Sequence, residues 1–426
     1  MVHCPVRVND LVEPVSVQPV SHYMIATATW YGAYGMQSVV FAWLVTIVLR
    51  EPAERVGWAQ TMLLVPSMVL ILFAGAIADR VGAARQAMWS QFAAALIPVM
   101  LIGALLFFEL TYTIMIVYAI VTGTAQAFVT PSRDGLLNQV AQGNVQRTVM
   151  QTSLAQFGLQ IVGYTIAGFA DRLGAEVILA IQSGVLLIGV WGYRQIHVAT
   201  HAVRPISSFS GGHVFQGIME GAVTVMSNPI MRVVVLQNVA MAFFFMGTFI
   251  VAFPLVVREV FAGSSGDLAI LSGFNSLGLV VTILVLLRVG YVQRPGRALL
   301  VGQGVGAIAL FTTGLVGNFT YFVALVFAWG MCGGIAMPMC RTLMQELAPP
   351  EQRSRVMSFF AFSFMGAGPM GALMVGYLAE VFGPQPTILI CSAAMLLSIV
   401  IVGVATPMWA THFAQSSHVG PEEALA

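Results

Sequence analysis

The sequence predicts an all-α membrane protein in which twelve transmembrane helices form two pseudo-symmetric bundles of six. Its composition is 58% hydrophobic and only 8% charged, whereas a soluble domain carries roughly 25% charged residues. Unpaired backbone groups are costly in hydrocarbon, so membrane spans are helices or closed barrels. The apolar stretches are of helix-spanning length and lack the alternation of barrel strands, which favours helices. An internal sequence repeat predicts that the helices are divided into two bundles.

Twelve apolar stretches are separated by short polar turns, with one longer break in the middle of the chain. We expect 1–22 as a cytoplasmic tail, 23–194 and 232–405 as the bundles, 195–231 as a central cytoplasmic linker and 406–426 as a second tail. Within the linker, Val214–Met226 is amphipathic, which suits either a helix on the membrane surface or a mobile connection. The expected spans are 24–49, 58–78, 86–108, 112–131, 149–170, 177–193, 233–256, 268–287, 298–316, 321–339, 356–379 and 386–405.

The arginines predict the orientation. All 18 basic residues are Arg. Fourteen of them fall in segments on the same side as the amino terminus, and four, Arg50, Arg55, Arg172 and Arg258, fall on the other side. Cytoplasmic segments carry the excess of basic residues. We therefore expect a multi-pass protein of the inner (plasma) membrane with both termini in the cytoplasm.

The two halves repeat each other at a fixed spacing. Two such halves predict a central cavity at their interface, which a substrate reaches alternately from either side. Gly123, Pro131, Leu136, Ala141, Val149, Met150 and Phe157 recur 207 residues later as Gly330, Pro338, Leu343, Ala348, Val356, Met357 and Phe364.

Several functional classes are disfavoured. The net charge of +1 argues against a nucleic-acid partner, which needs a concentrated basic face. The four cysteines form no CxxC pair, and no metal-ligand set or nucleophile–base set is visible. We expect no enzyme activity, no cofactor and no metal. A membrane enzyme or a lipid-handling protein without gradient coupling is the alternative from another class.

A charged loop lies between the second and third expected spans, with the sequence Gly75-Ala-Ile-Ala-Asp79-Arg80-Val-Gly82-Ala-Ala-Arg85. It resembles the loop between helices 2 and 3 of the major facilitator superfamily of secondary transporters, in which Gly75, Asp79, Arg80 and Gly82 match. Arg85 supplies one basic residue, but Ala84 and Gln86 stand where others are common. A weaker copy, Gln293–Arg297, lies between expected helices 8 and 9. The resemblance extends over residues 22–405.

Three segments are similar to the drug and siderophore efflux branch that includes enterobactin exporters. They are Trp30–Leu49, the turn Pro131–Asp134 and the amphipathic linker segment. The resemblance implies a monomeric exporter of amphipathic or hydrophobic small molecules that works by alternating access, as a proton antiporter. An uptake permease, or a lysophospholipid-type transporter without proton coupling, stays open as the alternative.

The resemblance also implies a gate on the cytoplasmic side. Asp79 would dock at the amino end of helix 11 near Arg355, where a carboxylate is stabilised by about 0.3–1 kcal/mol. Arg80 or Arg85 would pair with Asp134, in the turn that also holds Arg133. Asp134 and Arg341 occupy equivalent positions of the two halves with opposite charge, which suggests an ion pair between the halves.

A glycine motif departs from the family pattern. Antiporters of the superfamily carry a G-P-x-x-G-G-like motif on helix 5, but here Gly163–Gly168 has Tyr164 in place of the proline. A version with Gly368, Pro369 and Gly371 lies on expected helix 11 instead. Close packing of helices through small residues is the other interpretation.

The expected spans hold no Asp, Glu, His or Arg near mid-membrane, which disfavours a strongly charged substrate at the centre. If protons drive transport, their carriers lie nearer a rim, at Asp79, Asp134 or Glu346 inside or at Glu109 or Glu380 outside. We expect amides and aromatic rings to line the cavity instead. Each amide either hydrogen-bonds to a neighbouring helix or contacts the substrate. The candidate cavity residues are Trp30, Tyr34, Gln37, Phe41, Gln126, Gln156, Gln160, Asn238, Met241, Phe245 and Asn275.

Overall fold

A computed structural model of the chain describes residues 18–140, 145–196, 211–289, 292–349 and 352–410. Within these ranges the chain is helical and has no strand. The first half contains α1 (Gln18–Trp43), its π-helical continuation η2 (Leu44–Val48), α2 (Ala53–Val81), α3 (Ala83–Phe107), α4 (Tyr112–Val140), α5 (Val145–Ala167), the short α6 (Ala170–Leu173) and α7 (Ala175–Arg194).

The second half begins with α8, the helix of the central linker. Its next helix runs without a break from α9 through two π-helical segments into α10. The elements are α8 (Gly211–Ser227), α9 (Pro229–Ala240), η3 (Met241–Met246), η4 (Thr248–Ala252), α10 (Phe253–Glu259), α11 (Ser265–Val289), α12 (Pro295–Thr313), α13 (Phe319–Leu347), α14 (Arg353–Phe382), α15 (Pro384–Ala405) and the short η5 (Pro407–Ala410).

The chain is a multi-pass membrane protein. Nine helical stretches in the described ranges are long and apolar enough to cross a membrane, which confirms the predicted all-α membrane fold. Three further helices, α2, α5 and α12, lie among them. The number of twelve spans stays a prediction, as does the boundary between the bundles, because 197–210 lie outside the described residues.

Several helices extend beyond the apolar stretch that predicted them. Helix α4 continues past the expected end at residue 131 to Val140, and α13 continues past residue 339 to Leu347. Both contain an internal proline, Pro131 or Pro338, and neither stops there. Hydropathy detects only the part of a helix that lies in hydrocarbon, so it misses the polar turns that project beyond the membrane.

Following the predicted division of the chain, we call α1–α7 the first bundle and α9–α15 the second bundle. The repeat is visible in the packing of the helices. Helix α4 packs on α2 at Gly123, where an added Cβ would collide with the Leu63 carbonyl, and α13 packs on α11 at Gly330, where it would collide with the Asn275 carbonyl. Equivalent glycines therefore permit equivalent close approaches.

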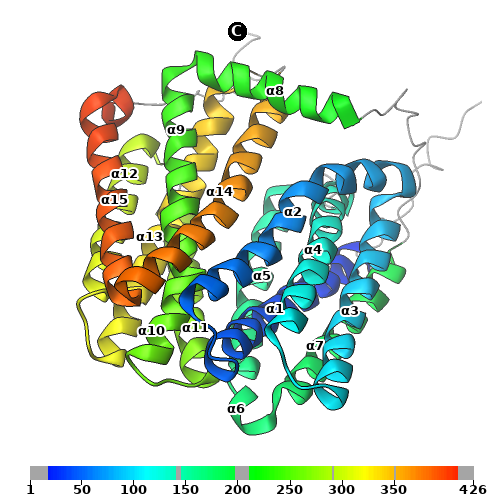
Figure 1. Cartoon of the computed structure of the whole chain (residues 1–426). Coiled ribbons are helices and arrows are strands. Elements are labelled where there is room, and N and C mark those ends of the chain that lie inside the picture. Colours follow the sequence, from blue (N-terminus) through cyan, green and yellow to red (C-terminus); the bar gives the residue numbers. More distant parts are fainter. Residues whose placement is uncertain (1–17, 141–144, 197–210, 290–291, 350–351, 411–426) are drawn as a thin grey trace, which may run out of the picture.

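The bundles meet through α2 against α14 and α5 against α11. Their ribbons converge near α6, α10 and α11 and separate toward the opposite end, where α8 lies across the second bundle (Figure 1). A substrate path between the bundles would therefore be closed at the α6/α10 end. That end carries the segments predicted to face outside.

Candidate functional site

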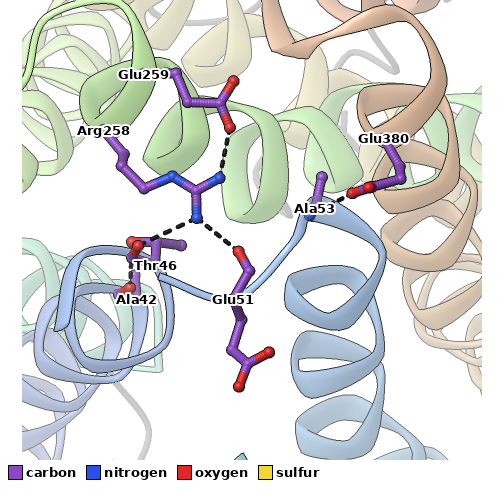
Figure 2. Close-up of polar contacts among 7 residues, drawn as sticks. All are labelled: Ala42, Thr46, Glu51, Ala53, Arg258, Glu259 and Glu380. Atoms are coloured by element: carbon purple, nitrogen blue, oxygen red, sulfur yellow. Dashed lines mark hydrogen bonds and ion pairs between the residues drawn. The ribbon is translucent and has the colours of Figure 1, made fainter. Parts of the chain in front are cut away.

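Arg258 joins the bundles at the end where they converge. This α10 side chain is mostly buried, with 18% of it exposed. Its guanidinium donates to the backbone carbonyls of Thr46 (3.2 Å) and Glu51 (2.6 Å) of the first bundle and pairs with Glu259 of its own helix (Figure 2). Carbonyls at the end of a helix lack intrahelical donors. Arg258 supplies the missing donor across the interface.

Glu380, near the carboxyl end of α14, makes a second connection. Its carboxylate accepts a hydrogen bond from the backbone N–H of Ala53, the first residue of α2, at 2.8 Å (Figure 2). A carboxylate at a helix amino terminus is favoured both by the free N–H groups and by the helix dipole. One turn further along, Trp58 Nε1 donates to the Tyr377 hydroxyl at 3.2 Å.

Asp171 of α6 makes the third connection. Its carboxylate accepts from the Trp43 indole N–H at 2.8 Å and from the backbone N–H of Ser265, at the start of α11. The Ser265 hydroxyl in turn donates to the Gly168 carbonyl at 3.1 Å. We refer to Arg258, Asp171 and Glu380 with these partners as the polar gate. It ties the bundles together at one end.

Close packing of α2 on α14 continues from the polar gate toward the middle of the protein. At the crossing, a Cβ on Gly376 would lie 2.9 Å from Gly57 Cα and 3.0 Å from the Ala53 carbonyl oxygen. Further in, the Thr61 hydroxyl donates to the Pro369 carbonyl at 3.1 Å. Only glycine at the crossing lets the two backbones approach this closely.

Three cavities follow one another through the middle of the protein. The first-bundle cavity, of about 30 Å³, is lined by polar side chains that include Tyr34, Gln37, Thr122, Gln126 and Gln182. The interface cavity, of about 80 Å³, lies between the bundles and shares Tyr34 and Gln37 with it. The second-bundle cavity, of about 280 Å³, shares Met246 and Phe249 with the interface cavity. Its other lining residues include Met241, Phe245, Asn275, Gln303, Trp329, Cys332 and Gly333.

Most of the candidate cavity residues line this series of cavities. Trp30, Tyr34, Gln37 and Gln126 line the first-bundle cavity, and the Gln126 amide donates to Gln37 Oε1 at 3.4 Å. Phe41 lines the interface cavity. Met241, Phe245 and Asn275 line the second-bundle cavity.

Three of the candidate amides lie elsewhere. Gln160 donates to the hydroxyl of Tyr164, one turn away on α5, at 2.7 Å. Asn238 donates to the Phe360 carbonyl (3.2 Å) and the Ser363 hydroxyl (3.3 Å), and so bonds helix to helix. Gln156 is half-buried and lines none of the three cavities described above.

Sequence reasoning named Glu380 as a possible proton carrier but missed Gln303, Trp329 and the contacts of the polar gate. Gln303 is the only amide of α12, so no helical spacing of polar residues marked it. Trp329 stands among apolar residues of α13, so no polar pattern marks it. The polar gate uses backbone atoms on one side of each connection, which a sequence does not display. Only the sparse outer charges, Arg258, Asp171 and Glu380, could have indicated it.

The predicted cytoplasmic gate is described in part. Gly82 has φ 95°, a left-handed conformation that favours glycine, and connects α2 to α3 in a single residue. Arg85 and Arg341 are exposed. The side chains of Asp79, Arg80 and Asp134, and the surroundings of Gly75, lie outside what the structure describes. Their pairing stays a prediction.

Arg133 of the same predicted gate is buried. Its guanidinium lies over the ring of Tyr31 on α1, 4.7 Å from the ring centroid. The Tyr23 hydroxyl donates to the Arg133 backbone carbonyl at 3.3 Å. The end of α4 is thereby fixed to α1 within the first bundle.

Helix α8 covers the amino end of α14, where Asp79 was expected to dock. Glu220 pairs with Arg355, and the Thr224 hydroxyl hydrogen-bonds Gln352. Gly221 packs so closely that a Cβ would collide with the Arg355 carbonyl. Met219 and Val223, one turn apart, are exposed on α8. The linker helix therefore presents an apolar strip while it contacts α14.

The glycine motifs lie at close helix contacts. An added Cβ at Gly163 would collide with the Gly32 carbonyl of α1, and one at Gly371 would collide with the Phe243 carbonyl. Gly168 faces Ala269 across the bundle interface, where the Cβ atoms would be 2.9 Å apart. Gly368 faces Met246, and the Pro369 carbonyl accepts from Thr61.

Comparisons with known proteins agree with this architecture. A family model described as Major Facilitator Superfamily matches residues 235–419. The multidrug efflux pump Tap of Mycolicibacterium fortuitum is 25% identical over 394 residues, which cover 89% of this chain and 93% of the pump.

Among solved structures, a mutant of the nucleoside transporter NupG aligns with a TM-score of 0.70 at 14% identity, over 89% of this chain and 98% of NupG. A structure from a study of proton dependent oligopeptide transporters aligns with a TM-score of 0.68 at 11% identity, over 93% of this chain and 99% of the transporter. At these identities the structural likeness concerns the fold.

Proposed function

We propose that this chain, which resembles transporters of the major facilitator superfamily, exports amphipathic or hydrophobic small molecules, such as drugs or a secreted siderophore, by alternating access. The observation that carries this proposal is the series of cavities that crosses the bundle interface. It is tied shut at one end by the polar gate. A substrate held there would be released to one side or the other as the bundles rock.

The chemistry of the cavities favours an amphipathic solute. The first-bundle cavity offers amides and hydroxyls, and the second-bundle cavity offers aromatic rings and three methionines, Met241, Met246 and Met337. Methionine side chains adapt to differently shaped ligands. A molecule with one polar and one apolar end fits this arrangement. Similarity to a multidrug efflux pump supports export as the direction.

Under the predicted orientation the polar gate lies outside, and the structure corresponds to the inward-facing state. We propose that protons entering from outside open the polar gate. Glu380 is exposed and bonds across the interface through its carboxylate, so a proton on that oxygen would weaken the contact with Ala53. Glu109 lies beside α3 and α4, and Glu346 is exposed on α13. Neither belongs to the gate.

Everted membrane vesicles test the direction and the coupling. When the vesicle interior is more acidic than the medium, vesicles that contain the protein should accumulate ethidium, and vesicles without the protein should not. A protonophore should abolish the difference. Accumulation in right-side-out vesicles instead would show uptake and would contradict the proposal.

Substitution Glu380→Gln should remove the proton dependence. The glutamine keeps the acceptor for the Ala53 N–H but cannot take up a proton. Gradient-driven ethidium accumulation should fall about tenfold or more, while exchange of ethidium down its own gradient continues. Glu109→Gln is the matched control and should behave as the unchanged protein. Undiminished proton-driven transport by Glu380→Gln would exclude Glu380 as the carrier.

The cytoplasmic latch stays part of the proposal for the opposite, outward-facing state. There Asp79 would dock at the amino end of α14, beside α8. Contacts worth about 2 kcal/mol in one state shift an equilibrium roughly 30-fold. Asp79→Asn should therefore reduce ethidium efflux while membrane insertion and protein abundance, measured by immunoblot, are unchanged. A parallel loss of protein would contradict the latch.

A lysophospholipid-type transporter is the second candidate, because a groove of about 630 Å³ opens between α3 and α4. Its lining is mostly apolar, with residues such as Met100, Leu101 and Val117, and it includes the carboxylate residue Glu109. The same vesicles loaded with a fluorescent lysophospholipid distinguish the two functions. Transfer of the lipid without any ethidium transport would favour this candidate.

A further inference from the structure

Gln303 of α12 is a buried amide. Its side chain is 1% exposed and lines the second-bundle cavity. Neither the amide nitrogen nor the amide oxygen has a hydrogen-bond partner in the part of the chain that the structure describes. A buried polar group left unsatisfied costs about 1–3 kcal/mol. Such a cost in a roomy cavity indicates a ligand that supplies the missing partners.

The rest of that cavity is built for a flat apolar group. Trp329 packs against both Phe245 and Phe249, with ring centroids 5.8 Å from each. The volume of 280 Å³ is slightly below the roughly 300–1,000 Å³ of typical small-molecule pockets, so one ring system fits. A buried water is held by about three polar partners. Apart from Gln303, the amide of Asn275 is the main polar side chain in the lining, so water alone would be poorly held.

The internal repeat shows that the space is specific to the second bundle. At the offset of 207 residues, Thr122 and Gln126 of the first-bundle cavity correspond to Trp329 and Gly333 of the second-bundle cavity. The first-bundle cavity, which Thr122 and Gln126 line, has a volume of about 30 Å³. The second-bundle cavity, where Gly333 takes the place of the glutamine, has a volume of about 280 Å³. In the second bundle, an indole ring stands where the first bundle has a threonine hydroxyl, and a glycine stands where it has a glutamine amide.

We propose that the second-bundle cavity is a substrate subsite for a neutral, planar ring that carries an adjacent N–H and C=O, as in a lactam or an imide. The Gln303 amide nitrogen donates to the ring carbonyl, and the amide oxygen accepts from the ring N–H. Trp329 and Phe249 contact the face of the ring. This subsite rests on the proposed export function and specifies the chemistry of one end of the substrate.

Two matched ligands test the subsite. 2-Quinolone has the adjacent N–H and C=O, and N-methyl-2-quinolone lacks only the donor. Binding to the purified full-length protein in detergent is followed by quenching of tryptophan fluorescence. The unchanged protein should prefer 2-quinolone by at least tenfold, because a site built to bond an N–H rejects an analogue without it. 2-Quinolone should also slow alkylation of Cys332, which lines the same cavity.

Two variants make the test specific to Gln303. Gln303→Leu keeps the size but removes the amide, and it should abolish the preference between the two ligands. Gln237→Leu is the matched control, since Gln237 is also 1% exposed but bonds the Ser398 carbonyl and lines none of the three cavities. The control should keep the tenfold preference. If Gln303→Leu does not fold, Gln303→Met replaces it.

Equal preference in the unchanged protein and in Gln303→Leu would overturn the subsite, as would alkylation of Cys332 that the ligand does not slow. These outcomes concern binding in detergent, without a proton gradient. A protein that discriminates the ligands but transports nothing in vesicles would contradict the export function alone. Transport of ethidium without ligand discrimination would contradict only the subsite.

Discussion

Substitution Gly376→Val is expected to shift the protein out of the state closed at the polar gate and to reduce ethidium export at least tenfold. Any side chain at position 376 meets the backbone of Gly57 and Ala53 within about 3 Å while the bundles are closed there. Overpacking of this kind costs about 1–3 kcal/mol. In the proposed outward-facing state the bundles separate at this end and the collision is relieved, so we expect the balance between states to shift about 5- to 150-fold.

The shift can be measured at the interface cavity. Ser272 lines that cavity, and in a Ser272→Cys background a membrane-impermeant thiol reagent added from outside should react faster when Gly376→Val is present. Gly304→Val is the matched control, because a Cβ at Gly304 meets nothing within 4 Å. Labelling at the rate of the unchanged protein, together with normal export, would show that the α2–α14 crossing is not part of the gate.

Arg258→Ala is expected to open the protein at the polar gate, because it removes the charged side chain that joins the two bundles there. The substitution leaves the Thr46 and Glu51 carbonyls without their donor across the interface. Hydrogen bonds to charged groups contribute about 1.5–3 kcal/mol each, and water can replace part of that once the end opens. We expect a shift of about 30-fold toward the outward-facing state and a similar loss of export, measured by labelling and by vesicle transport.

Two other arginine variants give the comparison. Arg258→Lys should restore part of the activity, because a lysine supplies one donor but not the fork that reaches both carbonyls. Arg55→Ala removes an exposed arginine of α2 whose ion pair joins it to Glu51, four residues earlier in the same bundle, and exposed pairs contribute about 0–1 kcal/mol. If Arg55→Ala and Arg258→Ala had equal effects, general surface charge rather than the gate contact would explain both.

The fold could be predicted because hydrocarbon imposes strong constraints. The length of the apolar stretches and the repeat around Gly123 and Gly330 predicted an all-helical membrane protein, which the structure confirms. The resemblance stated for the charged loop agrees with the family model that matches residues 235–419. The ends of the helices were harder to predict, as α4 and α13 show, because hydropathy does not indicate where a helix ends outside the membrane.

The candidate site could be predicted only in part. Trp30, Tyr34 and Gln37 follow helical spacing on α1, and that spacing brought them to one face that lines the cavities. Asn238 has the same chemistry as Asn275, yet it bonds a neighbouring helix while Asn275 lines a cavity. Sequence cannot separate the two, because the difference depends on which carbonyl happens to be within reach. Gln303 was missed for a different reason, because it is the only amide of α12 and no helical spacing of polar residues marks it.

The polar gate joins a side chain on one surface to backbone atoms on the other at three points: Arg258 to Thr46 and Glu51, Glu380 to Ala53, and Asp171 to Ser265. Every residue type except proline presents the same backbone N–H, and every residue type presents the same C=O. The receiving surface can therefore accumulate substitutions without losing the connection. A transporter built this way can change its cavity and much of its exterior over evolutionary time, while three side chains preserve the ability to close.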